Sequence, residues 1–167
     1  MTALATSVST AVGALIGGGI VVAGNYQTAR LAFRRDEKEW TRRRADIRID
    51  EQRAAIKDLQ DEVAKYARAV SRTHHSDVIA ARFGTPYGTS QVGTEIAEAL
   101  RASADAVRRL ESRVGDADMR RLSGELRTRG TDVTQSKSEG DALSHLAGMY
   151  QIAEQLDHRV GDVLDRL

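Results

Sequence analysis

The chain has 167 residues, a formal net charge of +1, one proline and no cysteine. Its length allows one compact domain beside a shorter segment, and the lack of cysteine excludes disulfides, thiolate metal sites and a thiol nucleophile. Few aromatic and many charged residues favour long helices over sheets. We therefore expect an all-α protein.

The first charged side chain belongs to Arg30, so residues 1–29 form one uncharged segment. About 20 apolar residues that rise about 1.5 Å each can cross a hydrocarbon layer of about 30 Å as a helix. A cleaved signal peptide would start with basic residues, and this segment has none. A buried core helix is the other alternative, but the unbroken absence of charge argues against it. We predict a transmembrane anchor over residues 1–29.

Residues 30–48 follow as a basic juxtamembrane helix with eight cations. By the positive-inside rule, this helix and the body after it lie in the cytoplasm. The prediction is a single-pass protein of the inner (plasma) membrane with its N-terminus outside. We expect Arg30, Arg34 and Arg35 to reach lipid headgroups, which makes the lipid bilayer a partner.

The positive charge is concentrated beside this predicted membrane surface. Arg30–Arg72 holds 13 basic and 9 acidic residues, a net +4, whereas Thr73–Leu167 holds 12 basic and 15 acidic residues, a net −3. A nucleic-acid-binding protein more often carries a basic face on its distal domain as well. No nucleic-acid partner is therefore expected.

Small residues recur within the uncharged segment at four-residue spacing. Gly13 and Gly17 form a G-x-x-x-G pair, and Gly18 follows Ala14 at the same spacing. Such spacing lets two helices approach closely in a bilayer, which would make the protein a homo-oligomer. A span rich in alanine and glycine also produces these spacings by chance, so both interpretations remain open.

Residues 49–167 are predicted to form a cytoplasmic helical bundle. A heptad pattern begins at Ile49 and predicts a first core helix. The first core position of the heptad recurs at Ile49, Ile56, Val63 and Val70, and the second at Gln52, Leu59 and Tyr66. Phe83–Ser90 contains glycine and proline and predicts a loop.

A second helix should start near Thr94, whose hydroxyl could cap its first turn. Its apolar stripe comprises Ile96, Leu100, Val107, Leu110 and Val114. The stripe weakens at Gly115-Asp116 and continues beyond it, which predicts a kinked helix. Arg129–Lys137 is polar and predicts a loop. Ser138 and Asp141 then resemble a capping box.

The last helix has the most regular pattern in the chain. Its apolar residues alternate at three and four residues to the C-terminus and form what we call the C-terminal seam: Leu146, Met149, Ala153, Leu156, Val160, Val163 and Leu167. Three long helices with narrow stripes predict an antiparallel three-helix bundle or coiled coil. The sequence leaves open whether this seam is bundle core or the interface with an unknown protein partner.

No constellation of catalytic residues accompanies these helices. Adjacent His74 and His75 point about 100° apart on a helix, and His145 and His158 lack ligand spacing, so no metal site is expected. Phosphate-loop, nucleophile-elbow and zinc-protease motifs are absent from the sequence. We expect neither an enzyme nor a cofactor.

The pattern from Gly13–Gly18 through Asn25, Gln27, Arg30 and Arg34-Arg35 to Trp40 and Arg43-Arg44 resembles a group of small single-pass membrane proteins of actinobacteria and their phages. The resemblance implies a glycine-rich span, an arginine-rich helix and a short helical bundle. The leading hypothesis is a membrane-anchored scaffold or adaptor that acts through protein–protein interaction. The alternatives are a holin-like, membrane-perturbing or pore-forming protein, and a phage or plasmid exclusion or defence component.

Overall fold

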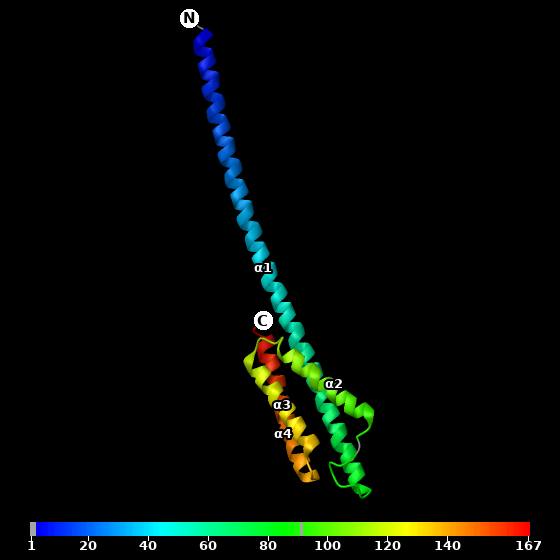
Figure 1. Cartoon of the computed structure of the whole chain (residues 1–167). Helices are drawn as coiled ribbons and strands as arrows, with labels where there is room; N and C mark the ends of the chain where they lie inside the picture. Colours follow the sequence, from blue (N-terminus) through cyan, green and yellow to red (C-terminus); the bar gives the residue numbers. More distant parts are fainter. Residues whose placement is uncertain (1–2, 91) are drawn as a thin grey trace. The chain divides into compact units, whose positions relative to one another are not determined.

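The computed structural model describes residues 3–90 and 92–167, with side chains at residue 30, residues 33–90 and residues 92–167. All regular secondary structure in these residues is α-helical: α1 (Ala3–Arg82), α2 (Thr94–Glu111), α3 (Ala117–Gln135) and α4 (Glu139–Leu164) (Figure 1). The chain divides into two units, Met1–Arg48 and Ile49–Leu167. The helix α1 contributes to both.

The unit Met1–Arg48 contains the predicted anchor and the basic helix. In the part of the chain that the structure describes, no helix is long and apolar enough to cross a membrane. The predicted span at residues 1–29 lies outside the residues whose side chains are described. Residues 34–48 are exposed, with Trp40 56% exposed and the Arg44 guanidinium 3.8 Å from the centre of its ring.

The unit Ile49–Leu167 is a bundle of four helical segments rather than the predicted three. Hydrogen bonds join Gln52 to residues 113 and 115, and Tyr66 to the carbonyl of Arg127. Along α4, Gln60 contacts Asp157 and Ser71 contacts Tyr150. The second part of α1 is therefore parallel to α3 and antiparallel to α2 and α4.

The core lies between these helices and uses the predicted faces. The buried residues of α1 include both heptad positions, with Leu59 and Val70 fully buried. Met119, Leu122, Leu126 and Val133 face them from α3, and Ala142, Met149, Leu156 and Val160 do so from α4. The all-α expectation and the heptad pattern are confirmed for this unit.

The expected kink at Gly115-Asp116 is a complete break between α2 and α3. The Asp116 side chain accepts a hydrogen bond from the amide of Met119 at 2.9 Å and thus caps a new helix. Arg120 donates to the carbonyls of Val114 and Gly115 at 2.7 and 3.0 Å. The break is stable because side chains satisfy backbone groups that a continuous helix would have paired.

Two further local predictions differ from the structure. The stretch predicted as a loop at Arg129–Lys137 is helical as far as Gln135, because Gly130 and Val133 are buried against the bundle. Thr94 begins α2 but does not cap it, since the N-cap is Gly93 and has no side-chain hydrogen bond. The Ser138 cap is confirmed, with the Asp141 amide donating to its hydroxyl at 3.1 Å.

The Phe83–Ser90 loop is also confirmed, and its glycines explain its path. Gly84 and Gly88 have φ angles of +90° and +70°, a region that residues with a Cβ rarely adopt. Gly88 also packs against the backbone carbonyl of Ser136, which connects α3 to α4. The loop therefore closes the end of the bundle at which α3 and α4 meet.

Candidate binding groove

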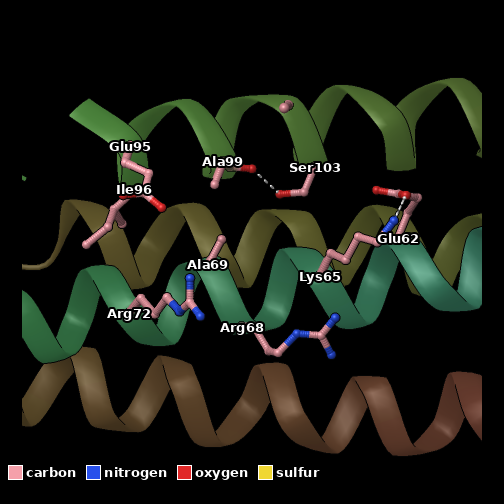
Figure 2. Close-up of a pocket in the computed structure, with 10 residues that line it drawn as sticks. Glu62, Lys65, Arg68, Ala69, Arg72, Glu95, Ile96, Ala99 and Ser103 are labelled. Carbon is pink, nitrogen blue, oxygen red and sulfur yellow. Dashed lines mark hydrogen bonds and ion pairs between the residues drawn. The ribbon is translucent and has the colours of Figure 1, made fainter. Parts of the chain in front are cut away.

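A surface hollow of the bundle runs between α1 and α2, and we call it the α1–α2 groove. It consists of two adjoining hollows of about 370 Å³ and 410 Å³ that share Glu62 and Lys65 in their walls. Figure 2 shows one end of the groove, where Arg68 and Arg72 extend from α1 and Ile96 and Ala99 lie on α2. The groove exists because α2 buries only Ser103, Val107 and Leu110.

Charges of opposite sign are separated along the α1 wall of this groove. Asp58, Asp61 and Glu62 lie at one end, and Lys65, Arg68 and Arg72 at the other. Lys65 donates to Glu62 Oε1 at 2.5 Å, which raises the pKa of the lysine above its ordinary value.

The α2 wall carries the opposite order of charge. Glu95 lies at the end that holds Arg68 and Arg72, and Arg109 lies at the end that holds Asp58 and Asp61. Between them the wall is formed by short side chains, which are Ala99, Ala102 and Ala106. The α2 wall is therefore lined by methyl groups and has a charged residue at each end.

Ion pairs fix the far end of the bundle. Arg159 donates to both carboxylate oxygens of Asp116 at 3.1 and 2.7 Å, so α4 is tied to the break between α2 and α3. These hydrogen bonds lower the pKa of Asp116. Arg127 makes a similar two-pronged contact with Glu111 at 2.9 and 3.0 Å. The second pair connects α3 to the end of α2, and neither pair lines the groove.

A second polar cluster lies where the Phe83–Ser90 loop meets α1. The Tyr87 hydroxyl is 2.6 Å from His74 Nδ1, and Ser90 donates a hydrogen bond to buried Asp77. Burial and the nearby carboxylates of Asp77 and Glu139 raise the pKa of Tyr87 to about 12. These contacts attach the loop to α1.

The structure places the C-terminal seam inside the bundle. Met149, Leu156 and Val160 are buried, while Leu146 and Val163 are half-buried and pack against the same core. A partner could reach Met149, Leu156 and Val160 only if the bundle opened. Arg30, Arg34 and Arg35 are exposed. Gly13, Gly17 and Gly18 lie outside the residues whose side chains are described.

The groove was not identified from the sequence, although a signal for it was present. Its α2 wall follows from residues spaced at four, three, four and three: Glu95, Ala99, Ala102, Ala106 and Arg109. The stronger stripe of leucine and valine on the same helix is adjacent to it. Alanine residues at such spacing indicate a groove only where the neighbouring helix does not cover them.

Among the residues that the structure describes, no group of three or more His, Asp or Glu side chains is placed to hold a metal ion. No family model, curated protein or solved structure matches the chain.

Proposed function

We propose that the protein is a membrane-anchored helical scaffold or adaptor that acts through protein–protein interaction. In this proposal residues 1–29 cross the inner membrane, residues 30–48 lie at its cytoplasmic surface, and Ile49–Leu167 presents the binding surface. The observation that carries it is the sequence of α1: one continuous helix holds the uncharged segment, eight cations and the first core face of the bundle.

The exposed side chains of residue 30 and residues 33–48 support the location at a membrane surface. Arg30, Arg34 and Arg35 are exposed, as expected for cations that pair with anionic headgroups. Phe33 and Trp40 are 74% and 56% exposed, and large aromatic residues favour the interface between water and lipid. The proposed topology has the N-terminus outside.

The bundle supports binding rather than catalysis. The contacts of its polar clusters serve helix capping, loop attachment and helix pairing, and the α1–α2 groove has a wall of alanine side chains and a charged rim. Grooves of this kind fit the face of another helix. A holin-like protein remains the alternative that the sequence of the span suggests.

The topology is tested with reporters on the full chain in bacterial cells. A C-terminal reporter that works only in the cytoplasm should be active, and an N-terminal one should not. Replacing Arg30, Arg34 and Arg35 with Glu should weaken this orientation, since each such cation contributes about 1 kcal/mol beside anionic lipid.

The matched control replaces three exposed arginines of the body, Arg101, Arg108 and Arg166, with Glu. It makes the same change in charge and should leave the orientation unchanged. An active N-terminal reporter in the wild-type chain would contradict the topology. Collapse of the membrane potential on expression would favour the holin-like alternative over the adaptor.

A further inference from the structure

The outer surface that α1 and α4 form together keeps large apolar side chains in contact with solvent. Ile79 of α1 is 42% exposed, and Leu143 and Tyr150 of α4 are each 49% exposed. The Tyr150 hydroxyl is 2.7 Å from the Ser71 hydroxyl, so the two helices are neighbours here. We call this surface, from Arg68 to Arg82 on α1 and from Glu139 to Glu154 on α4, the α1–α4 face.

The antiparallel register of the two helices brings the apolar residues of this face together. Because Ser71 lies level with Tyr150, a step forward along α1 corresponds to an equal step back along α4. Ile79 is eight residues after Ser71, and Leu143 is seven residues before Tyr150. Ile79 and Leu143 therefore lie at nearly the same level, and both are exposed.

The same register aligns an arginine with a glutamate on each side of these apolar residues. Arg82 and Glu139 are each eleven residues from Ser71 and Tyr150, and Arg68 and Glu154 are three and four residues from them. All four side chains are exposed. Arg68 is eleven residues from Ile79, and Glu154 is eleven residues from Leu143, a separation that keeps residues on one side of a helix.

The exposed charges of the two halves of the face have opposite sign. Asp77 is the acidic residue of α1 between residues 65 and 82, and it is buried. The exposed charged side chains of that stretch are basic: Lys65, Arg68, Arg72 and Arg82. Figure 2 shows Arg68 and Arg72 extending from α1. Residues 139–154 of α4 contain no lysine or arginine, and their charged side chains are acidic: Glu139, Asp141 and Glu154.

The complementary part of the face ends at Arg68 and Glu154. Nearer to Ile49, Asp157 accepts a hydrogen bond from Gln60 and thus lies level with Asp61, and both of these exposed residues are acidic. Within the α1–α4 face, one half is basic and the other half is acidic. Such a face is complementary to a second copy of itself.

The charges select one of the two ways in which a two-fold axis can bring two such faces together. An axis across the helices would place α1 on α1, with Arg68 opposite Arg82, and α4 on α4, with Glu139 opposite Glu154. An axis parallel to α1 places α1 of each copy on α4 of the other. Arg68 then meets Glu154, Arg82 meets Glu139, and Ile79 meets Leu143, at two symmetric sites.

We propose that the α1–α4 face is a homodimer interface, in which α1 of each copy packs on α4 of the other around a two-fold axis parallel to α1. Both α1 helices then run in the same direction, as two chains with the same proposed topology require. The inference rests on the proposed scaffold function and assigns it a self-association surface. This surface is the outer side of α4, whereas the buried residues of the C-terminal seam belong to the core.

The first experiment crosslinks two chains that carry one cysteine each. The wild-type chain has no cysteine, so Ile79→Cys and Leu143→Cys each introduce the only thiol of their chain. The two full-length variants carry different affinity tags and are expressed together. Membranes are treated with a bifunctional thiol reagent that spans ~8–10 Å, the usual distance between the axes of packed helices. We expect a crosslinked dimer that carries both tags.

The matched control combines Leu143→Cys with Ala99→Cys, which places the second thiol at an exposed position of α2. We expect at least about fivefold less dimer with both tags, because α2 lies outside the proposed interface and beyond the reach of the reagent. Equal crosslinking of the two combinations would overturn the proposal. Contacts within the membrane through Gly13 and Gly17 would not favour position 79 over position 99.

The second experiment reverses the charges of one half of the face at a time. Arg68→Glu with Arg82→Glu, or Glu139→Arg with Glu154→Arg, replaces each attractive pair with a repulsive one. We expect about tenfold less dimer for each double variant, measured as co-purification of two tags in mild detergent. The control, Arg101→Glu with Arg108→Glu at exposed positions of α2, should form as much dimer as the wild type.

Combining the two double variants restores opposite charges, since the acidic α1 of one chain then meets the basic α4 of the other. Circular dichroism first checks that each variant has the helical content of the wild type. The two variants expressed together should form a dimer with both tags at about the wild-type level, although neither pairs with itself. A combination that pairs no better than either variant alone would overturn the proposed dimer.

Membrane fractionation of the same variants separates this inference from the proposed function. All should remain in the membrane fraction, since the substitutions lie outside residues 1–48. Loss of the dimer with retention in the membrane overturns only the interface. A wild-type chain absent from the membrane overturns the anchor, while the crosslink can still be scored on the protein in solution.

Discussion

At Gly130, α3 packs against the aromatic ring of Tyr66 from α1. A Cβ built there would lie 2.7 Å from Tyr66 Cε1, closer than real carbon atoms pack. The hydroxyl of the same tyrosine donates to the carbonyl of Arg127 at 3.1 Å, so the ring is held in place. The glycine lets a polar stretch of sequence join the core as a helix.

Gly130→Ala should therefore lower the free energy of unfolding by about 1–3 kcal/mol, since the ring has to move. Gly124→Ala on the same helix is the control, because nothing lies within 4 Å of its built Cβ. There the lower backbone entropy of the unfolded chain should stabilise the protein by about 0.4–1 kcal/mol. Urea unfolding followed by circular dichroism measures both, and equal effects would contradict this account of Gly130.

Asp116 links helix capping to the pairing of α4. Its pKa lies below the ordinary 3.8, first because Arg159 donates to its carboxylate and also because the Met119 amide does. The folded state therefore favours the ionised form. The stabilisation is present above the pKa of the unfolded chain and is lost as the pH falls through the lower pKa of the folded state.

Asp116→Asn should lower the free energy of unfolding by about 1 kcal/mol at neutral pH, because asparagine still caps but cannot pair with arginine. The difference from the wild type should shrink as the pH falls below 3.8. Asp105→Asn, at an exposed position, should show neither effect. A difference between Asp116→Asn and the wild type that does not depend on pH would contradict the role of the charge.

At the scale of elements, the C-terminal seam is core rather than a free interface. Leu156 is 1% exposed, whereas Leu143 on the same helix is 49% exposed. Leu156→Ala should cost about 2–5 kcal/mol of unfolding free energy through lost burial and a cavity, while Leu143→Ala should cost well under about 1 kcal/mol. Chemical denaturation measures both. Similar losses would show that the C-terminal seam is not buried as described.

Periodicity predicted the elements whose stripes are long and apolar, and local chemistry predicted the loop at Phe83–Ser90 and the Ser138 cap. Neither predicted whether the helix bends or breaks at Gly115-Asp116, because the outcome depends on the hydrogen-bond partners of Asp116 and Arg120. The helical stretch after Arg129 was also missed, because its burial depends on Tyr66, which lies far away in the sequence. The α1–α2 groove depends on the distance between two helices, which the sequence of either helix alone does not determine.

At the scale of the whole molecule, the proposal assigns different tasks to the two units. In this proposal, the unit Met1–Arg48 anchors the chain in the membrane through an uncharged segment and a basic flank. The unit Ile49–Leu167 binds a protein partner. In the first unit, the spacing of Gly13 and Gly17 would also allow two spans to pack closely in the bilayer.

The central claim is that residues 1–29 anchor the chain in a membrane, and alkaline carbonate extraction of the full-length protein from bacterial membranes tests it most directly. The wild type should stay in the pellet. Ile16→Arg with Ile20→Arg should move to the supernatant, because each arginine at the centre of a span costs about 2.5–3.5 kcal/mol. The control, Ile47→Arg with Ile79→Arg at exposed positions, should stay in the pellet. Release of the wild-type protein by carbonate would contradict the account.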